Sequence, residues 1–387
     1  MNMKGGKLLA EGGYGCVFSP GIDCDGSSTI KKYVSKIQRY DSSAMNEIKL
    51  GKIIQNINGF QDHFSPILKY CNIDIAKIQD KEIDKCTILK KKSASKFILM
   101  KLQYIDGFDF MDYLINQKNS IQLISNIILS YNHLLKSLSM LISKNIIHFD
   151  IKGTNILFDS KKEIPLIIDF GLSTHFESLD IVKLKKIFYI YAPEYYIWSL
   201  EIHYLSYLLN KNKEPTKNEL TIITEEFVKN NKPFQKNFSP TFLKKYQKKC
   251  LTQLIKYNNM EFNKRIQYII SYWKSFDNYS LSIMYLKFLR YINFNGFIDN
   301  KFIIFFSKLL LKNLDPNIEN RLGITETIHT FNAFLYHKDI NNIQTFENLT
   351  KSFIENKDNI NNDIMIHKKN DIYMSKTMKI ARRESKK

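Results

Sequence analysis

Two short polar motifs, separated by an apolar strand, constrain the fold of this chain more than any other feature. The first motif occupies residues 148–155 and reads His-Phe-Asp-Ile-Lys-Gly-Thr-Asn, and the second, Asp-Phe-Gly, occupies residues 169–171. Between them, residues 164–168 are Ile-Pro-Leu-Ile-Ile, a run that is typical of a buried β-strand. The strand leads directly into Asp169, nineteen positions after Asp150. The order and spacing of the motifs therefore predict that the two carboxylates belong to one site.

The side chains in these motifs are the types that phosphoryl transfer requires. The reaction needs a base for the acceptor hydroxyl, oxygen ligands for Mg²⁺ and positive charge near the transferred group. Asp150 can serve as the base, and Lys152 can supply the positive charge. Asn155 and Asp169 carry the hard oxygen atoms that Mg²⁺ prefers. Taken singly, each motif is more often a turn or a strand end, so the inference depends on their joint occurrence.

Together the motifs resemble the catalytic loop and the metal-binding turn of the eukaryotic-type protein kinases. The resemblance runs from about residue 7 to residue 337 and implies a two-lobed α+β fold, with a small β-rich lobe and a larger, mostly helical lobe. We expect the small lobe in residues 1–104, the large lobe in residues 105–340, and a polar, basic, flexible tail in residues 341–387. By this resemblance, His148 is a packed structural histidine.

A glycine-rich segment near the N-terminus resembles the loop that covers the phosphates of ATP in this family. Residues 8–18 read as a strand, a glycine turn and a second strand. Glycine lets backbone N–H groups approach phosphates closely, although such a segment on its own is more often a hairpin turn. By the resemblance, the ATP contacts in this segment are Ala10, at the place of the family's first glycine, Gly12, Gly13, Tyr14, Gly15 and Val17.

Lys36 follows Val-Ser on an alternating strand, much as the family's phosphate-binding lysine follows Val-Ala. Its expected ion-pair partner is Glu47, eleven positions later on a helix that begins near Ser42. Both charges could instead be ordinary solvated side chains, as most Lys and Glu residues are. Residues 103–107 resemble the hinge between the lobes. The resemblance places further ATP contacts at the gatekeeper Leu102, at Gln103 and Ile105 of the hinge, at Asp109 near the ribose, and at Leu157.

Further features of the large lobe match structural positions of the family. Glu194 ends an Ala-Pro-Glu sequence and is expected to form a buried ion pair with Arg321. Asp277 is expected to begin a central helix and to hold the backbone of the catalytic loop. About residues 199–274 then form an insertion, either a docking surface or, as we favour, an elaborated surface of helices. Phe149 replaces the arginine that usually precedes the catalytic aspartate, so we expect no control by activation-segment phosphorylation.

Composition limits the compartment and the partners. The five cysteines form no C-x-x-C pair and indicate neither a disulfide framework nor a zinc site. The most apolar run, near residues 302–311, is too short and too interrupted to span a bilayer. We therefore expect no transmembrane segment and a location in the reducing cytoplasm. The formal net charge of +19 can attract acidic protein substrates, nucleic acid or an anionic surface, but no nucleic-acid module is recognisable. An AT-rich coding bias, which enriches lysine, asparagine and isoleucine, could also produce this charge without selection for binding.

We predict an active serine/threonine protein kinase that uses ATP with Mg²⁺ or Mn²⁺. Lys152, two residues after Asp150, resembles serine/threonine rather than tyrosine enzymes. Two alternatives are a kinase-like phosphotransferase for small molecules and a pseudokinase that serves as a scaffold. Residues 18–24 and 33–36 also resemble the small lobe of kinases from large nucleocytoplasmic DNA viruses. That resemblance implies a location in the cytoplasm of an infected host cell or in the virion.

Overall fold

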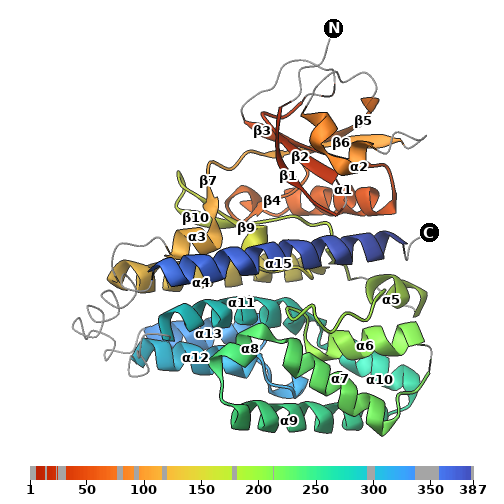
Figure 1. Cartoon of the computed structure of the whole chain (residues 1–387), viewed down its shortest axis with the longest axis vertical. Helices are drawn as coiled ribbons and strands as arrows, with labels where there is room; N and C mark the ends of the chain where they lie inside the picture. Colours follow the sequence, from red (N-terminus) through yellow and green to blue (C-terminus); the bar gives the residue numbers. More distant parts are fainter. Residues whose placement is uncertain are drawn as a thin grey trace.

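A five-stranded sheet forms a small N-terminal lobe, and most helices lie in a larger lobe of this computed structural model (Figure 1). The structure describes residues 6–13, 15–22, 24, 32–75, 82–90, 96–115, 120–176, 181–211, 213–293, 301–335 and 357–384. This arrangement confirms the predicted two-lobed α+β fold.

A five-stranded antiparallel sheet, in the order β1-β2-β3-β6-β5, forms the small lobe. Its strands are β1 (Lys7–Glu11), β2 (Gly15–Ser19), β3 (Tyr33–Arg39), β5 (Lys69–Ile73) and β6 (Phe97–Gln103). Because side chains alternate along a strand, β6 contributes to two apolar clusters. Phe97 and Leu99 pack in one cluster, and Ile98 and Met100 pack in the other. The sheet thus has an apolar layer on each face.

The helix α1 (Ser42–Gln55) covers the second of these clusters. It begins after Asp41, whose carboxylate accepts two hydrogen bonds of 3.0 Å from backbone N–H groups of the first turn. This cap satisfies donors that have no partner within the helix. Ile48 packs in the apolar cluster, and Glu47 beside it is also buried. The helix therefore carries a carboxylate to the sheet.

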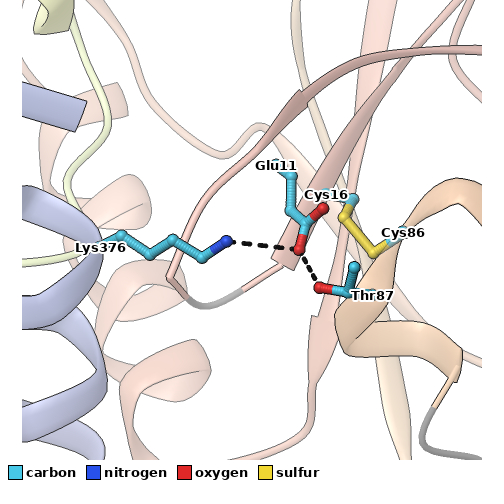
Figure 2. The surroundings of a disulfide bond; sticks show 5 residues. All are labelled: Glu11, Cys16, Cys86, Thr87 and Lys376. Carbon is cyan, nitrogen blue, oxygen red and sulfur yellow. Dashed lines mark hydrogen bonds and ion pairs between the residues drawn. A yellow bond between two sulfur atoms is a disulfide. The ribbon is translucent and has the colours of Figure 1, made fainter. Parts of the chain in front are cut away.

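Two disulfides cross-link the small lobe, one between Cys16 and Cys86 and one between Cys24 and Cys71. The first ties β2 to the segment that leads into the short helix α2 (Thr87–Lys90). Figure 2 shows this bond beside Glu11, whose carboxylate accepts hydrogen bonds from Thr87 and from Lys376.

The expectation that the cysteines form no disulfides is wrong. The paired cysteines lie 70 and 47 positions apart, so no short spacing marked them, and the folding of the sheet brings them together. Cys250, buried in the large lobe, is a free thiol. The cysteine pattern therefore no longer supports the expectation of a reducing compartment.

A second sheet, in the order β4-β10-β9-β7, and a two-stranded sheet of β8 and β11 carry the polar motifs. Their strands are β4 (Phe64–Ser65), β7 (Gly107–Asp109), β8 (Ile146–Ile147), β9 (Ile156–Asp159), β10 (Ile164–Ile168) and β11 (Thr174–His175). The first polar motif lies between β8 and β9, and Asp169 follows β10. Since β9 and β10 form an antiparallel hairpin, the chain turns back on itself between the motifs.

The large lobe is filled by one continuous apolar core, which also extends to Leu50 and Ile54 of α1. Its α-helices are α3 (Phe110–Ile115), α4 (Ser120–Ser143), α5 (Ile181–Ile187), α6 (Leu200–Lys211), α7 (Lys217–Asn230), α8 (Lys232–Asn237), α9 (Pro240–Asn258), α10 (Phe262–Ser271), α11 (Phe276–Asn293), α12 (Lys301–Asn313) and α13 (Ile324–Leu335). Helix α11 packs against α8 and α12, and α13 packs against α4. The predicted insertion, about residues 199–274, is helical and contributes apolar side chains to the same core.

Short 3-10 turns complete the described secondary structure: η1 (Phe60–Asp62), η3 (Ile83–Lys85), η4 (Gly153–Asn155), η5 (Trp273–Ser275) and η6 (Ile318–Asn320). None of the helices in the described part of the chain is both long and apolar enough to cross a membrane.

The last described element is a long helix, α15 (Lys357–Glu384). Figure 1 shows it lying across the molecule between the small-lobe strands and the large-lobe helices. The expectation of a flexible tail is therefore wrong for these residues. The physical reason is a set of partly buried ion pairs and hydrogen bonds to both lobes, which no periodicity within the tail indicated.

Candidate catalytic site

A single buried carboxylate on α11 accepts hydrogen bonds from the backbone of the first polar motif. Asp277 Oδ2 accepts a hydrogen bond of 2.7 Å from the N–H of His148, and Oδ1 accepts one of 3.0 Å from Phe149. Burial raises the pKa of Asp277 to about 6, against the lowering effect of the two N–H donors. The structure thus places Asp277 where the sequence predicted it.

His148 is fully buried and serves as a packing residue. Its Nε2 lies 3.1 Å from the carbonyl oxygen of Ile168, and its Nδ1 accepts from the N–H of Asp150 at 3.3 Å. Burial lowers the pKa of His148 to about 4. The imidazole is therefore neutral at pH 7 and ties the first motif to the end of β10.

Phe149 joins the motif to the segment that follows Asp169. Its φ of 63° is unusual for a bulky residue and marks a backbone held by its surroundings. Trp198 Nε1 donates to the Phe149 carbonyl at 2.9 Å, and the Phe149 ring makes edge contacts with Phe188 and Trp198. Aromatic packing thus holds this segment at the position where the family usually has an arginine.

Asp150 is fully buried and lies beside Lys152, which lines the site. Its Oδ1 lies 2.9 Å from Lys152 Nζ and accepts a hydrogen bond from the hydroxyl of Tyr195. Its Oδ2 accepts a hydrogen bond of 2.7 Å from the hydroxyl of Ser375. Burial by itself raises the pKa of Asp150, but the charges of Lys152 and Lys379 and the hydrogen bonds outweigh it, so the pKa is lowered. The carboxylate is therefore ionised and able to accept a proton.

Asn155 and Asp169 form a donor set that fits Mg²⁺. The Asn155 amide nitrogen donates to the Asp150 carbonyl at 2.9 Å, which leaves its Oδ1 as the ligand atom. Asp169 has a φ of 63°, an uncommon backbone conformation that also occurs at functional turns. One carboxylate and one amide oxygen suit a metal ion that brings phosphates and water as its other ligands. Among the described residues, no group of three or more His, Cys, Asp or Glu side chains forms a fuller metal cage.

The charge around Asp169 is strongly positive. Lys36 Nζ lies 3.8 Å from Asp169 Oδ1, and Lys379 forms an ion pair with Oδ2. Burial opposes ionisation, but these two ammonium groups hold the pKa of Asp169 far below its usual range. Asp169 is therefore ionised and paired with cations.

The predicted pair between Lys36 and Glu47 is present. Lys36 Nζ lies 2.7 Å from both carboxylate oxygens of Glu47, and both side chains are buried. The pair joins β3 to α1, so it holds the lysine at a fixed position facing Asp169.

These groups surround a cavity of about 620 Å³ between the glycine-rich segment and β9. Every predicted ATP contact lines it except Tyr14, which lies outside the described residues: Ala10, Gly12, Gly13, Gly15, Val17, Lys36, Leu102, Gln103, Ile105, Asp109 and Leu157. Asn155, Asp169 and Glu47 also line the cavity. The structure thus brings the residues of both lobes to one site.

Several lining residues were not assigned to the site from the sequence: Leu9, Val34, Ser65, Tyr104, Thr154, Lys368, Ile372, Ser375, Lys376 and Lys379. Val34 could have been found, because residues two apart on a strand face the same side and Lys36 was already assigned. The residues from α15 carried no comparable signal, since nothing local connects them with the cavity.

The predicted ion pair between Glu194 and Arg321 is wrong. Arg321 instead makes a bidentate pair with Glu201, at 2.9 and 3.0 Å, and both side chains are buried, whereas Glu194 is exposed. Glu201 lies in the first turn of α6, where a negative charge is favourable. The segment between Asp169 and the glutamate that pairs with Arg321 is thus seven residues longer than the Ala-Pro-Glu match suggested.

The comparison with protein-family models agrees with this geometry. A family model described as "Protein kinase domain" matches residues 4–332. A solved structure titled "Autoinhibited serine kinase domain of the giant muscle protein titin" has a TM-score of 0.43 and 14% sequence identity, and the match covers 91% of this chain and 87% of that chain. No curated protein matches the chain. Because the family model spans well over half of the chain, the chain belongs to the protein kinase family.

Proposed function

We propose that this kinase transfers the γ-phosphate of ATP, with Mg²⁺ as the metal, to serine or threonine hydroxyls of proteins. The observation that carries the proposal is the convergence of Lys36, Asn155 and Asp169 on one cavity, directly beside the ionised Asp150. A scaffold without activity would have no need of a buried, positively paired Asp150 or of a Lys36 held by Glu47.

Each side chain has a defined part in the transfer. Asp150 would orient the acceptor hydroxyl and take its proton as the new bond to phosphorus forms. Lys152, 2.9 Å from Asp150 Oδ1, would neutralise charge on the transferred phosphoryl group. Lys36 would hold the phosphates, fixed by its bonds to Glu47. Mg²⁺ held by Asn155 and Asp169 would add positive charge at the phosphates.

Two further features support finer parts of the proposal. Lys152 is buried against Asp150, as expected if it belongs to the acceptor site of a serine/threonine enzyme. The formal net charge of +19 favours acidic protein substrates. Phe149 packs on the aromatic side chains of the segment after Asp169, and an apolar contact of this kind needs no phosphate. We therefore expect activity without phosphorylation of that segment.

The test is phosphate transfer from labelled Mg²⁺-ATP by the full chain to an acidic and a basic generic protein, with phosphoamino-acid analysis of the products. We expect label on serine and threonine, and more of it on the acidic protein. Asp150→Asn should lower the rate by about 10²–10⁴-fold because the general base is lost. Nucleotide binding, followed by thermal shift, should hardly change.

The matched control is Asp106→Asn, which removes the same charge from a side chain that is 62% exposed at the hinge. This variant should transfer phosphate at the normal rate. Full activity in Asp150→Asn, or label on tyrosine alone, would contradict the proposal.

A further inference from the structure

Helix α15 forms one wall of the candidate catalytic site, because several of its side chains line the cavity. Ile372, Ser375, Lys376 and Lys379 line the cavity. Ser375 is 7% exposed and Lys379 is 4% exposed. A lysine is rarely buried to this extent unless it is paired, so the partners of these side chains show what the helix does.

Three carboxylates of the site each have a partner on α15: the predicted ribose contact, the proposed base for the acceptor hydroxyl, and the proposed metal ligand. The pairs are Lys368 with Asp109 at 3.1 Å, Ser375 with Asp150 at 2.7 Å, and Lys379 with Asp169. Along the helix the three partners are spaced by seven and then four residues, which places them on one face. A single face of α15 thus contacts all three functional positions.

The chemistry of these contacts matches the groups that catalysis needs there. Lys379 puts a positive charge on Asp169, so its ammonium group and a metal ion compete for the same carboxylate. Ser375 places a hydroxyl against Asp150, where an acceptor hydroxyl would have to lie. In addition, Lys152 Nζ donates to the carbonyl oxygen of Asp371 at 3.2 Å.

Ion pairs also attach α15 to the small lobe. Arg383 lies 3.1 Å from the Asp41 carboxylate that caps α1. Lys376 lies 3.4 Å from Glu11 at the end of β1, beside the disulfide of Cys16 (Figure 2). The helix therefore holds both the glycine-rich segment and the helix that carries Glu47.

Contacts with the large lobe are more numerous. Asp371 lies 2.8 Å from both Lys287 Nζ and the hydroxyl of Tyr196, and Tyr189 donates to the Met378 carbonyl at 2.8 Å.

Close to Asp169, the buried Arg382 donates to the carbonyl oxygens of Gly171 and Ser173 at 3.2 and 3.1 Å, and to the hydroxyl of Thr174 at 3.1 Å. These bonds fix the start of the segment that follows Asp169.

We propose that α15 is an inhibitory segment built into the chain, which occupies the acceptor and metal positions of its own catalytic site. The inference rests on the proposed function, because it takes Asp150 and Asp169 as the base and the metal ligand. Since α15 also binds both lobes, a protein substrate and the metal gain access only when the helix leaves.

The experiment measures the dissociation constant of ADP for the full chain by calorimetry, in Mg²⁺ and in EDTA, together with the rate of phosphate transfer. In the wild type, Mg²⁺ should improve ADP affinity little, because Lys379 holds Asp169. Lys379→Ala frees this carboxylate, so Mg²⁺ should improve ADP affinity by about tenfold, and the transfer rate should rise by about tenfold or more.

A second variant tests the other contact without altering Lys379. Ser375→Asp places a carboxylate against Asp150, and repulsion between the two should expel α15. It should therefore raise Mg²⁺-dependent affinity and rate as Lys379→Ala does. The matched control is Lys369→Ala, which removes the same charge from an exposed position on α15 and should behave as the wild type.

The outcomes separate this inference from the proposed function. If the wild type, Lys379→Ala and Ser375→Asp show the same Mg²⁺ dependence of ADP affinity and the same transfer rate, the inference is overturned. The proposed kinase activity is not affected by that result. Variants that gain Mg²⁺-dependent affinity but transfer no phosphate would support the inhibitory helix and refute the kinase activity.

Discussion

The two lobes hold their functional residues in place by different means. In the small lobe, two modest apolar clusters are supplemented by two disulfides, one of which ends on β2 beside the glycine-rich segment. In the large lobe, one continuous core surrounds buried polar contacts between distant parts of the chain. Asp277 reaches His148 across 129 positions, and Arg321 reaches Glu201 across 120. The small lobe thus depends on covalent bonds where the large lobe depends on buried charge and hydrogen bonding.

The largest effect should follow from breaking the buried ion pair of the large lobe. Arg321→Met leaves the Glu201 carboxylate buried without its partner, and the free energy of unfolding should fall by about 3–5 kcal/mol. Both tryptophans, Trp198 and Trp273, lie in the large lobe, so fluorescence during urea denaturation measures this loss.

The double variant Glu201→Leu with Arg321→Met is the control for this first prediction. It removes both charges and should recover much of the lost stability, because an apolar pair can replace a buried ion pair. A loss below about 1 kcal/mol in the single variant would mean that the pair behaves like a surface salt bridge.

Removal of the disulfide at β2 should have the next largest effect, and it should be confined to the small lobe. Replacing Cys16 and Cys86 together by serine should lower the stability of that lobe by about 2–4 kcal/mol, since a long loop is no longer closed. ADP binding should weaken in urea before the tryptophan fluorescence changes. Treatment of the wild type with dithiothreitol should act in the same direction.

The contrasting control is Cys250→Ser, at the free cysteine buried in the large lobe. This variant should change the urea concentration at which the tryptophan fluorescence of the large lobe changes. If loss of the small-lobe disulfide shifted the urea transitions of ADP binding and of fluorescence by the same amount, the two lobes would unfold as one unit. The proposed difference between the lobes would then be wrong.

Acidic pH should produce the smallest and most gradual effect. Burial lowers the pKa of His63 and His148 to about 4 and that of His203 to about 3, from an ordinary value of 6.5. At pH values between these lowered pKa values and 6.5, the unfolded chain binds more protons than the folded chain. The stability that the neutral histidines contribute to the folded chain is therefore fully present above about pH 6.5 and is lost as the pH falls toward 4.

Asp277 acts in the opposite direction, because burial raises its pKa from 3.8 to about 6. Protonation in that range favours the folded chain and offsets part of the histidine effect. Melting temperatures followed by circular dichroism from pH 7.5 to 4.5 should therefore decline gradually. A melting temperature that stays level or rises over this range would contradict the prediction.

The fold and the centre of the site could be predicted because their signals are local. Asp150, Asn155 and Asp169 belong to short motifs, and Lys36 and Glu47 were placed by the resemblance of their segments to those of the protein kinases. Asp277 could also be placed, because it begins a helix at a recognisable position.

The errors concern contacts that local rules do not determine. Glu194 and Glu201 lie on the same segment, and only the folded core decides which of them reaches Arg321. The disulfides depend on how the small-lobe strands lie beside one another. Helix α15 is stabilised by acids of the cleft, such as Asp169, so its position could not be deduced from the tail alone.

Helix α15 belongs to the same chain as the site that it fills, and its binding is therefore unimolecular. A tethered segment of this kind acts at an effective concentration in the millimolar range, whatever the concentration of the protein. Dilution will not relieve it, and a substrate of ordinary affinity will not displace it by mass action. The rate of phosphate transfer would then depend on how long α15 stays in the site. Any partner that binds the released helix would therefore control the enzyme without contacting its catalytic residues.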